Sequence, residues 1–301
     1  MMVKVPPIKI QGIKTKLVPL IRQYAAVEND TVWVEPFMGS GVVGFNLAPQ
    51  RAIFADLNPH LVNFYRSLQR GLFSSDDVRD FLREEGAELQ KRGEAYYKEV
   101  RSRFNRNHSP LDFLFLNRAC FNGLIRFNKK HAFNVPYCHK DERFAQAYIT
   151  KICNQVKWVE DLFRVRDWIF VHRSFHDLIA ELPREKKLFI YCDPPYIGRH
   201  VDYFDSWEED DERRLKNLLD ELDAPYMIST WDYNRYRRNH YIDSVWGNCR
   251  KINKEHFYFV GAKEDNRNPM MEALLVNYEV DSLESSPSML PQKAHQGILQ
   301  L

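Results

Sequence analysis

The chain has 301 residues, 44% of them hydrophobic, and a formal net charge of +2. This length can bury a large core, as one big domain or two modest ones. No apolar run approaches the roughly 18 residues needed to span a bilayer, and the first seven residues lack the apolar core of a signal peptide. Composition therefore excludes a membrane-spanning or secreted protein, and we expect a soluble, cytoplasmic one. The five cysteines contain no Cys-x-x-Cys pair, which predicts free thiols.

The first 70 residues alternate between helical and strand patterns. We predict helices over residues 15–26, 41–48 and 59–70, and strands over residues 31–35 and 51–56. Strands that alternate with helices in this way are typical of a mostly parallel sheet covered on both faces.

A glycine turn follows the first predicted strand. Gly39 and Gly41 let the backbone approach a ligand closely and adopt dihedral angles that are closed to other residues. The second strand ends at Asp56, about where a doubly wound nucleotide-binding fold places the acid that binds a ribose. A Gly-x-Gly turn alone is more often only a turn, so the prediction of a nucleotide site depends on Asp56 and on a motif further along the chain.

From residue 76 to about residue 168 the sequence becomes charged and helical. Within it, residues 101–143 carry nine Lys or Arg against three Asp or Glu, with aromatic residues among the cations. Such a segment suits the phosphates and bases of nucleic acid, although a solvated helical surface has the same composition. We predict a helical insertion between the second and third strands.

Strand patterns return in the last third of the chain, and the final two, separated by a polar loop, predict a hairpin. The fold class that follows is α/β, doubly wound, with a mostly parallel sheet and an antiparallel C-terminal hairpin. The predicted strands cover residues 168–172, 187–192, 226–229, 255–261 and 271–280.

The most informative motif comes directly after the strand at 187–192. Pro194 and Pro195 cannot donate to a sheet ladder, so the strand must end there with the backbone held extended. Asp193 and the Pro194 carbonyl can then accept the two hydrogens of an exocyclic amine, while Tyr196 stacks on the ring that carries it. The alternative is a plain strand end, with Asp193 as a turn cap and Tyr196 as packing.

Taken in chain order, these motifs resemble the Dam-like (D12 class) adenine-specific DNA methyltransferases, and within that family most closely the modification methylase of the EcoRV restriction system. The resemblance covers about residues 5–280. It implies transfer of a methyl group from S-adenosyl-L-methionine to the exocyclic amine of a flipped-out adenine in double-stranded DNA. The matching segments are residues 9–14 (Lys-Ile-Gln-Gly-Ile-Lys), 35–41 (Glu-Pro-Phe-Met-Gly-Ser-Gly), 56, 121–126 (Phe-Asn-Gly-Leu-Ile-Arg), 133–136 (Phe-Asn-Val-Pro) and 193–196 (Asp-Pro-Pro-Tyr).

The resemblance also implies which residues form the catalytic and donor sites. Asp193, Pro194 and Tyr196 would be catalytic. No metal is expected, because the ten histidines show no His-Glu-x-x-His or comparable spacing. The residues expected to bind S-adenosyl-L-methionine are Lys14, Glu35, Phe37, Gly39, Gly41, Asp56 and Phe175.

A further set of positions is expected to bind the DNA. Lys and Arg bond guanine in the major groove, and apolar side chains meet the thymine methyl. The resemblance implies the target GATATC, with a GATC-type site as the alternative. For Arg126 a second interpretation stays open, in which its side chain contacts only a phosphate. The expected DNA-binding residues are Lys9, Phe121, Asn122, Leu124, Arg126 and Pro136.

The same resemblance divides the chain into domains. Residues 1–70 and 168–280 are expected to form the catalytic, donor-binding domain, residues 71–167 the DNA target-recognition domain, and residues 281–301 a disordered tail. We expect a monomer that acts either with a cognate restriction endonuclease for the same site or as an orphan methylase.

Other activities use similar motifs. Cytosine amines are methylated with the same motif types, and Asn-Pro-Pro-Tyr serves protein glutamine and RNA methylation, but Asp at position 193 favours adenine in DNA. Methylation of cytosine carbon 5 needs a cysteine nucleophile, typically after proline, and the chain has no Pro-Cys pair. A catalytically silent DNA-binding protein is disfavoured by the intact Asp193 and Tyr196.

Overall fold

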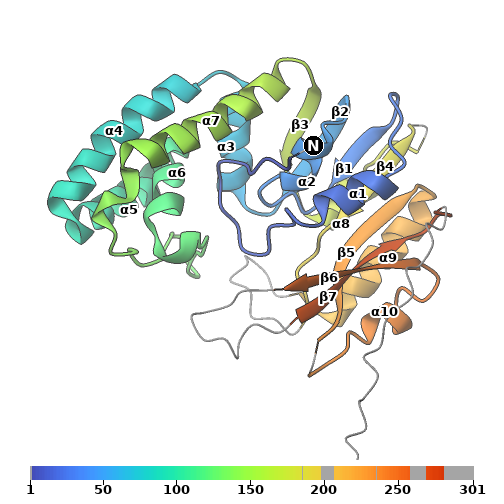
Figure 1. Ribbon diagram of the computed structural model, residues 1–301. Helices are drawn as coiled ribbons and strands as arrows, with labels where there is room; N and C mark the ends of the chain where they lie inside the picture. The colour runs from blue at the N-terminus through green and yellow to red at the C-terminus, as the bar shows by residue number, and fades with distance from the viewer. Residues whose placement is uncertain (1, 185, 198–206, 235, 258–268, 281–301) are drawn as a thin grey trace, which may run out of the picture.

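The computed structural model describes residues 2–184, 186–197, 207–234, 236–257 and 269–280. Over these ranges the chain forms a sheet of seven strands, with a group of helices beside it (Figure 1). The strands lie in the order β3-β2-β1-β4-β5-β7-β6. Their bounds are β1 Val32–Glu35, β2 Arg51–Asp56, β3 Asp167–His172, β4 Leu188–Cys192, β5 Tyr226–Asn234, β6 Arg250–Phe257 and β7 Pro269–Val276.

The sheet confirms the predicted fold class. β1 to β5 pair in parallel, and β7 is antiparallel to both β5 and β6. The predicted bounds of the hairpin are wrong, since β6 begins at Arg250 rather than at 255 and β7 ends at Val276. β6 is an edge strand rich in charged residues. Charged side chains are common on edge strands, and they hide the alternation of apolar and polar residues from which a strand is predicted. β5 also runs beyond the predicted 226–229, because β7 pairs with it as far as Asn234.

The helices α1 to α3 fall within the predicted ranges, and α4 to α7, between α3 and β3, make up the predicted insertion. The full set is α1 Val18–Tyr24, α2 Val42–Leu47, α3 Pro59–Gln69, α4 Ser75–Arg92, α5 Glu94–Asn107, α6 Pro110–Ala119, α7 Gln146–Phe163, α8 Phe175–Ala180, α9 Glu209–Leu222 and α10 Tyr241–Ser244, with 3-10 turns at Phe121–Gly123 and Asp141–Phe144.

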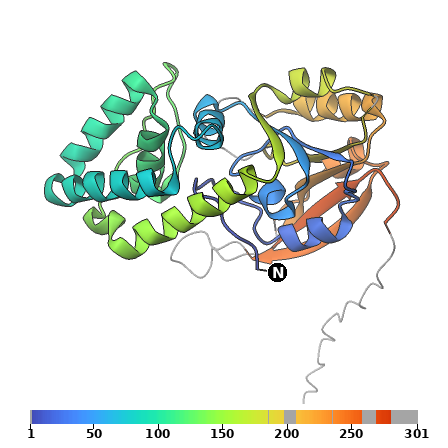
Figure 2. The same ribbon diagram turned by 90° about the horizontal axis from the view of Figure 1, so that it is seen from above.

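Helices cover both faces of the sheet, as seen from above in Figure 2. Successive side chains of a strand point to opposite faces, and the buried strands feed two separate cores accordingly. In β1, Val32 and Val34 pack with α8 and α9, whereas Trp33 packs with α1, α2 and α3. In β4, Ile190 and Tyr191 divide between the two cores in the same way.

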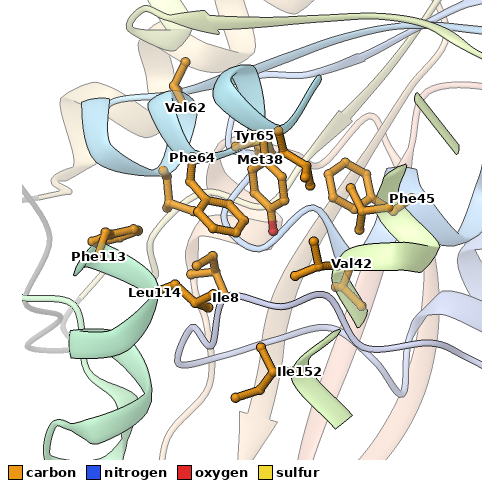
Figure 3. Packing of buried hydrophobic residues seen from close by; sticks show 14 of the residues in the cluster. Ile8, Met38, Val42, Phe45, Val62, Phe64, Tyr65, Phe113, Leu114 and Ile152 are labelled. Carbon is orange, nitrogen blue, oxygen red and sulfur yellow. The ribbon is translucent and has the colours of Figure 1, made fainter. Parts of the chain in front are cut away.

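The inserted helices share the larger of these cores with the sheet. Figure 3 shows where they meet: Ile8 from the N-terminal segment lies among Tyr65 of α3, Leu114 of α6 and Ile152 of α7. Each of these side chains is 2% exposed or less. The N-terminal segment is therefore packed between the sheet and the insertion.

Some predictions concern other parts of the chain. The five cysteines are all free, as predicted. No helix in the described ranges is long and apolar enough to cross a membrane. The predicted disordered tail and most of the polar loop at 262–269 lie outside the described residues.

The glycine turn after β1 contains a third functional glycine that the sequence interpretation left out. Gly44 follows Gly39 and Gly41 in the spacing Gly-x-Gly-x-x-Gly, in which the third glycine permits close packing of helix on strand. A Cβ on Gly44 would lie 2.7 Å from Glu35 Oε2 and closer still to the Phe54 ring. α2 therefore packs against β1 and β2 at a distance that only glycine allows.

We expect Gly44→Ala to destabilise the protein by about 1–3 kcal/mol, because the added methyl overpacks the contact between α2 and the sheet. Urea denaturation measures this loss. Gly71→Ala is the control, since a Cβ there meets nothing within 4 Å and only the φ of +69° is strained, which costs about 1–2 kcal/mol. A Gly44→Ala protein as stable as the wild type would contradict the packing argument.

Candidate functional site

A pocket of about 840 Å³ lies at the carboxyl ends of the parallel strands. The strand order reverses between β1 and β4, and open α/β sheets bind ligands at such a point. Lining residues come from the N-terminal segment, the turn after β1, the ends of β2 and β4, and the starts of α8 and α9. The structure therefore brings the motif after β4 and the glycine turn to one cavity.

Asp193 is the charged centre of this pocket. β4 ends at Cys192, as the two prolines predict, and Asp193 follows directly. Lys14 Nζ lies 2.8 Å from Asp193 Oδ1 and 5.0 Å from the centroid of the Tyr196 ring. Lys14 is 7% exposed and Tyr196 is 9% exposed, whereas the Asp193 side chain is 23% exposed, so a buried cation and a buried ring face a carboxylate that the pocket can reach.

A second hydrogen bond orients the Asp193 carboxylate. Ser229 on β5 donates its hydroxyl to Asp193 Oδ1 at 2.7 Å, and Tyr191 donates to Ser229 Oγ at 2.9 Å. Burial raises the pKa of Asp193, while the Lys14 ammonium and the Ser229 hydroxyl oppose that rise. Lys14 and Ser229 thus favour the ionised form of a carboxyl that burial alone would protonate.

Asp56 ties the end of β2 to the glycine turn. Its Oδ2 accepts the Gly39 N–H at 2.9 Å and its Oδ1 accepts the Asn58 N–H at 2.8 Å. Burial raises the pKa of Asp56 to about 6, and the two N–H bonds act against that rise. A carboxylate has about four acceptor positions, so Asp56 can still accept hydroxyl hydrogens from the pocket.

Glu35 is a buried brace behind the pocket. Its Oε2 accepts Trp33 Nε1–H at 3.0 Å and the Gly44 N–H at 3.1 Å, and the residue is 2% exposed. Burial raises the pKa of Glu35 to about 8, and the charge of Asp193 adds to the rise. Unlike Asp193, Glu35 has no cation beside it among the contacts of the described residues, so it is protonated at neutral pH.

Three aromatic rings form one wall of the pocket. Phe37 stacks on Phe175 with ring centroids 5.5 Å apart, and Trp207 contacts both, at 5.4 and 5.3 Å. Buried Glu212 accepts the indole N–H of Trp207 at 2.6 Å and that of Trp246 at 2.7 Å. Glu212 thereby fixes the ring that closes this wall.

The residues expected to bind DNA gather beside the same pocket. Asn117 joins them: it donates to the carbonyls of Lys9 and Gly123 at 2.9 and 3.1 Å and accepts the Lys9 N–H. Leu124 lines the pocket, and Phe121 is 51% exposed. Burial, together with the nearby Arg118 guanidinium, lowers the pKa of Lys9 to about 8.

The remaining three expected DNA-binding residues lie on the surface of the loop that follows α6. Asn122 and Pro136 are exposed, and the Pro136 carbonyl accepts the Phe121 N–H at 2.9 Å. Arg126 is half-buried and donates its Nε–H to Asn134 Oδ1 at 2.8 Å. Asn134 therefore holds one edge of the guanidinium and sets its direction.

The net positive charge of residues 101–143 overstates the surface available to DNA. Arg103 is paired with Asp112 at 2.5 Å and with Glu85 at 2.7 Å. Arg118 is 6% exposed and donates to Gln155 and to the Pro7 carbonyl. Phe104, Phe133 and Tyr137 belong to the core. The exposed cations of the segment are Arg106, Lys129, Lys130 and Lys140.

Several site residues were missed by the sequence interpretation. Ser229 and Asn117 carry no local signal, because each acts through a hydrogen bond to a segment far away in the chain. Trp207 could have been suspected, since a lone tryptophan precedes the acidic start of α9. Within the described ranges no group of three or more His, Cys, Asp or Glu side chains is arranged to hold a metal ion.

Comparisons with known proteins agree with this geometry. The family model of the D12 class N6 adenine-specific DNA methyltransferases matches residues 11–260. The chain is 29% identical to the type II methyltransferase M.MjaIII of Methanocaldococcus jannaschii, over 91% of this chain and 99% of that protein. It is 30% identical to the DNA adenine methylase of Serratia marcescens, over 75% and 83%. The retron Ec67 DNA adenine methylase of Escherichia coli is 31% identical, over 69% and 74%.

The pKa of Glu35 predicts a pH-dependent stability. The folded protein keeps the Glu35 proton up to about pH 8, whereas the unfolded chain loses it near the ordinary value of 4.5. Stability from this group is complete below pH 4.5 and is lost as the pH rises toward 8. Glu35→Gln mimics the protonated acid and removes this loss.

Between pH 5 and 7.5, the free energy of unfolding of the wild type should fall by about 1–3 kcal/mol relative to Glu35→Gln. Urea denaturation across this range measures the difference. Glu84→Gln, on the exposed surface of α4, is the control and should follow the wild type. Parallel curves for the wild type and Glu35→Gln would show that Glu35 is ionised in the folded protein.

Proposed function

The chain belongs to the D12 class of N6 adenine-specific DNA methyltransferases, and we propose that Asp193, Pro194 and Tyr196 hold a flipped-out adenine of its DNA substrate for methyl transfer. The chain is thus an adenine-specific DNA methyltransferase, and the resemblance of its motifs to that family is confirmed. The observation that carries the proposal is the pairing of half-buried Asp193 with buried Lys14 at 2.8 Å, beside the face of Tyr196.

Asp193 and Pro194 prepare the amine for reaction. An adenine amine is a poor nucleophile, because its lone pair is conjugated with the ring. If the Asp193 carboxylate and the Pro194 carbonyl each accept one amine hydrogen, the nitrogen can pyramidalise and direct its lone pair into the pocket. The carboxylate also stabilises the positive charge that develops on nitrogen, which is electrostatic preorganisation and needs no prior deprotonation.

The pocket fits the methyl donor that the family implies. When bound, S-adenosyl-L-methionine supplies an electrophilic methyl group on a sulfonium. The lining carries more carboxyl groups than cations, which suits a ligand that bears positive charge. We propose that Asp56 accepts the ribose hydroxyls, that Phe37 and Phe175 hold the adenine of the donor, and that Lys14 and Glu35 border its methionine part. Gly39 lines the pocket, and its φ of +51° favours glycine there, whereas a Cβ on Gly41, with a φ of +75°, would meet the Phe45 ring.

The acceptor adenine must leave the duplex to reach Asp193, because its amine is paired and stacked there. We propose that Tyr196 stacks on the flipped base and that this stacking offsets part of the free energy needed to unpair and unstack it. Phe121 is 51% exposed, three residues before Leu124, which lines the pocket, and this supports its role as the ring that fills the space left in the helix.

For the recognised sequence we propose GATATC, with a GATC-type site as the alternative. The resemblance to the EcoRV modification methylase supports the first, and Lys9, Leu124, Arg126 and Pro136 stand at positions that read a GATC-type core in Dam-like relatives. Mapping N6-methyladenine in DNA from cells that express the protein tests target and activity together. Unmodified adenine at both sequences would reject them, and unmodified DNA throughout would reject the wider proposal.

We also propose the organisation in which this activity works. Residues 71–167 would act as the target-recognition domain on a catalytic domain made of residues 1–70 and 168–280. A monomer suffices for methylation of one strand at a time. The name of the relative from Methanocaldococcus jannaschii, a type II methyltransferase, supports a restriction endonuclease for the same site as the functional partner.

Asp193→Asn should lower turnover by about 10²–10³-fold, because the developing positive charge on the amine loses its carboxylate. Incorporation of tritiated methyl groups into DNA measures the rate, and calorimetry with S-adenosyl-L-methionine measures donor binding, which should change little. Turnover near that of the wild type would refute the role of Asp193. Loss of donor binding equal to the loss of turnover would place Asp193 in the donor site instead.

Ser229→Ala is the matched control for Asp193→Asn. It removes one hydrogen bond from the same carboxylate but keeps the charge, so turnover should fall by only about tenfold. Because the Ser229 hydroxyl lowers the pKa of Asp193, its loss should move the acid limb of the kcat/KM profile to higher pH. Tyr191→Phe keeps the Ser229 hydroxyl and should shift that limb less.

Arg126→Ala should relax discrimination at one base pair of the target by about 1–3 kcal/mol. Methylation rates on duplexes that carry single base-pair changes measure the discrimination. Lys130→Ala, at an exposed cation of the same loop, is the control and should leave the sequence preference unchanged. A uniform loss across all duplexes in Arg126→Ala would instead assign Arg126 to a phosphate.

A further inference from the structure

A second strongly basic segment, separate from the helical insertion, follows β5. Residues 233–241 (Tyr-Asn-Arg-Tyr-Arg-Arg-Asn-His-Tyr) contain three Arg, one His and three Tyr, with no Asp or Glu. Exposed tyrosines among arginines are the composition of a nucleic-acid contact rather than of a core. The residues of this segment that carry the proposal are Tyr233, Tyr236, Arg237 and Arg238, here called the β5 turn.

The β5 turn lies at the same edge of the sheet as the catalytic motif. β4 and β5 are parallel neighbours, so their carboxyl ends lie at the same edge of the sheet. Asp193 follows the first of these ends and the β5 turn follows the second. A chain of contacts joins the two places. Tyr196 packs with Trp231 in a small buried cluster, and the Arg237 guanidinium lies over the Trp231 ring, 4.9 Å from its centroid.

The turn has a rigid base and an exposed tip. Buried Asn239 donates to Thr230 Oγ1 at 3.2 Å and to the Trp231 carbonyl at 2.9 Å, and Tyr233 and Arg238 form an antiparallel bridge. Tyr236 is 73% exposed. Such preorganised donors bind a ligand at a smaller entropic cost than a flexible loop does.

We propose that the β5 turn binds the phosphates of the DNA strand next to the flipped adenine, on the side of the pocket away from the helical insertion. The inference rests on the proposed function. A base held on Tyr196 remains joined to backbone on both sides, and the insertion reaches the pocket through Leu124. The β5 turn is joined to Tyr196 through Trp231 instead, and its arginine guanidinium and tyrosine hydroxyl groups are donors suited to phosphate.

The test compares Arg237→Ala/Arg238→Ala with the wild type for binding to two duplexes, one with the mapped target and one without it. A contact with two phosphates predicts weaker binding to both, by roughly tenfold, and a slope of log K against log salt that is smaller by about 1.8. The proposal is overturned if the slope does not change, or if only the duplex with the target is affected.

Two further variants separate contact from structure. Arg237→Lys/Arg238→Lys keeps the charges and should restore the slope, which a loss of packing on Trp231 would not allow. Arg164→Ala is the matched control, because Arg164 and Arg238 are similarly exposed and similarly paired. Arg164 is 66% exposed, with its guanidinium 3.3 Å from the Asp161 carboxylate, and Arg238 is 54% exposed, with its guanidinium 3.2 Å from the Asp243 carboxylate. Arg164 lies beside the start of β3, at the opposite edge of the sheet, and its loss should leave the slope unchanged.

The same samples distinguish this inference from the proposed function. If the wild type methylates no adenine in DNA, the proposed function fails whatever the slopes are. If the wild type methylates DNA and the double alanine variant binds both duplexes as Arg164→Ala does, only the β5 turn is rejected.

Discussion

The ion pair of Lys14 with Asp193 is the constraint on which the rest of the site depends. A carboxylate at the end of a buried strand loses hydration, and it stays charged only if a cation and hydrogen-bond donors replace the water. Asp193 comes from β4, Ser229 from β5 and Lys14 from the N-terminal segment. The interactions that favour the ionised form of Asp193 therefore require three distant parts of the chain to be in place together.

The N-terminal segment also joins this site to the insertion. Lys9 is bound through its backbone to Asn117 on α6, and five residues later Lys14 reaches Asp193. Between them Gly12, with a φ of +76°, allows the segment to turn toward the pocket. The loop after α6 and the Asp193 carboxylate are thus held by the same short, hydrogen-bonded segment.

The sequence was enough for the fold and for the residues that belong to local motifs. The glycine turn, Asp56 and the motif after β4 are each encoded within a few residues, so their place at the strand ends follows from the strand pattern. The start of the edge strand β6 was predicted wrongly because its charged residues face solvent and do not show the pattern of a strand that packs on a core. Ser229, Asn117 and Trp207 were missed because their roles exist only once distant segments meet. Arg103 and Arg118 were included in the predicted basic surface although they do not belong to it. Arg103 is paired with carboxylates and Arg118 is buried.

Two carboxyl groups of this pocket differ in their surroundings, because among the described contacts only Asp193 has a cation beside it. The charge of Asp193 adds to the raised pKa of Glu35, and Glu35 has neutral donors, the Trp33 indole and the Gly44 amide, as its hydrogen-bond partners. The proton is therefore held at Glu35, whose neutral form spares Asp193 a nearby negative charge. Lys14 then acts on a single carboxylate. Glu35, which braces the glycine turn from β1, and Asp193, which follows β4, are in this way coupled by charge.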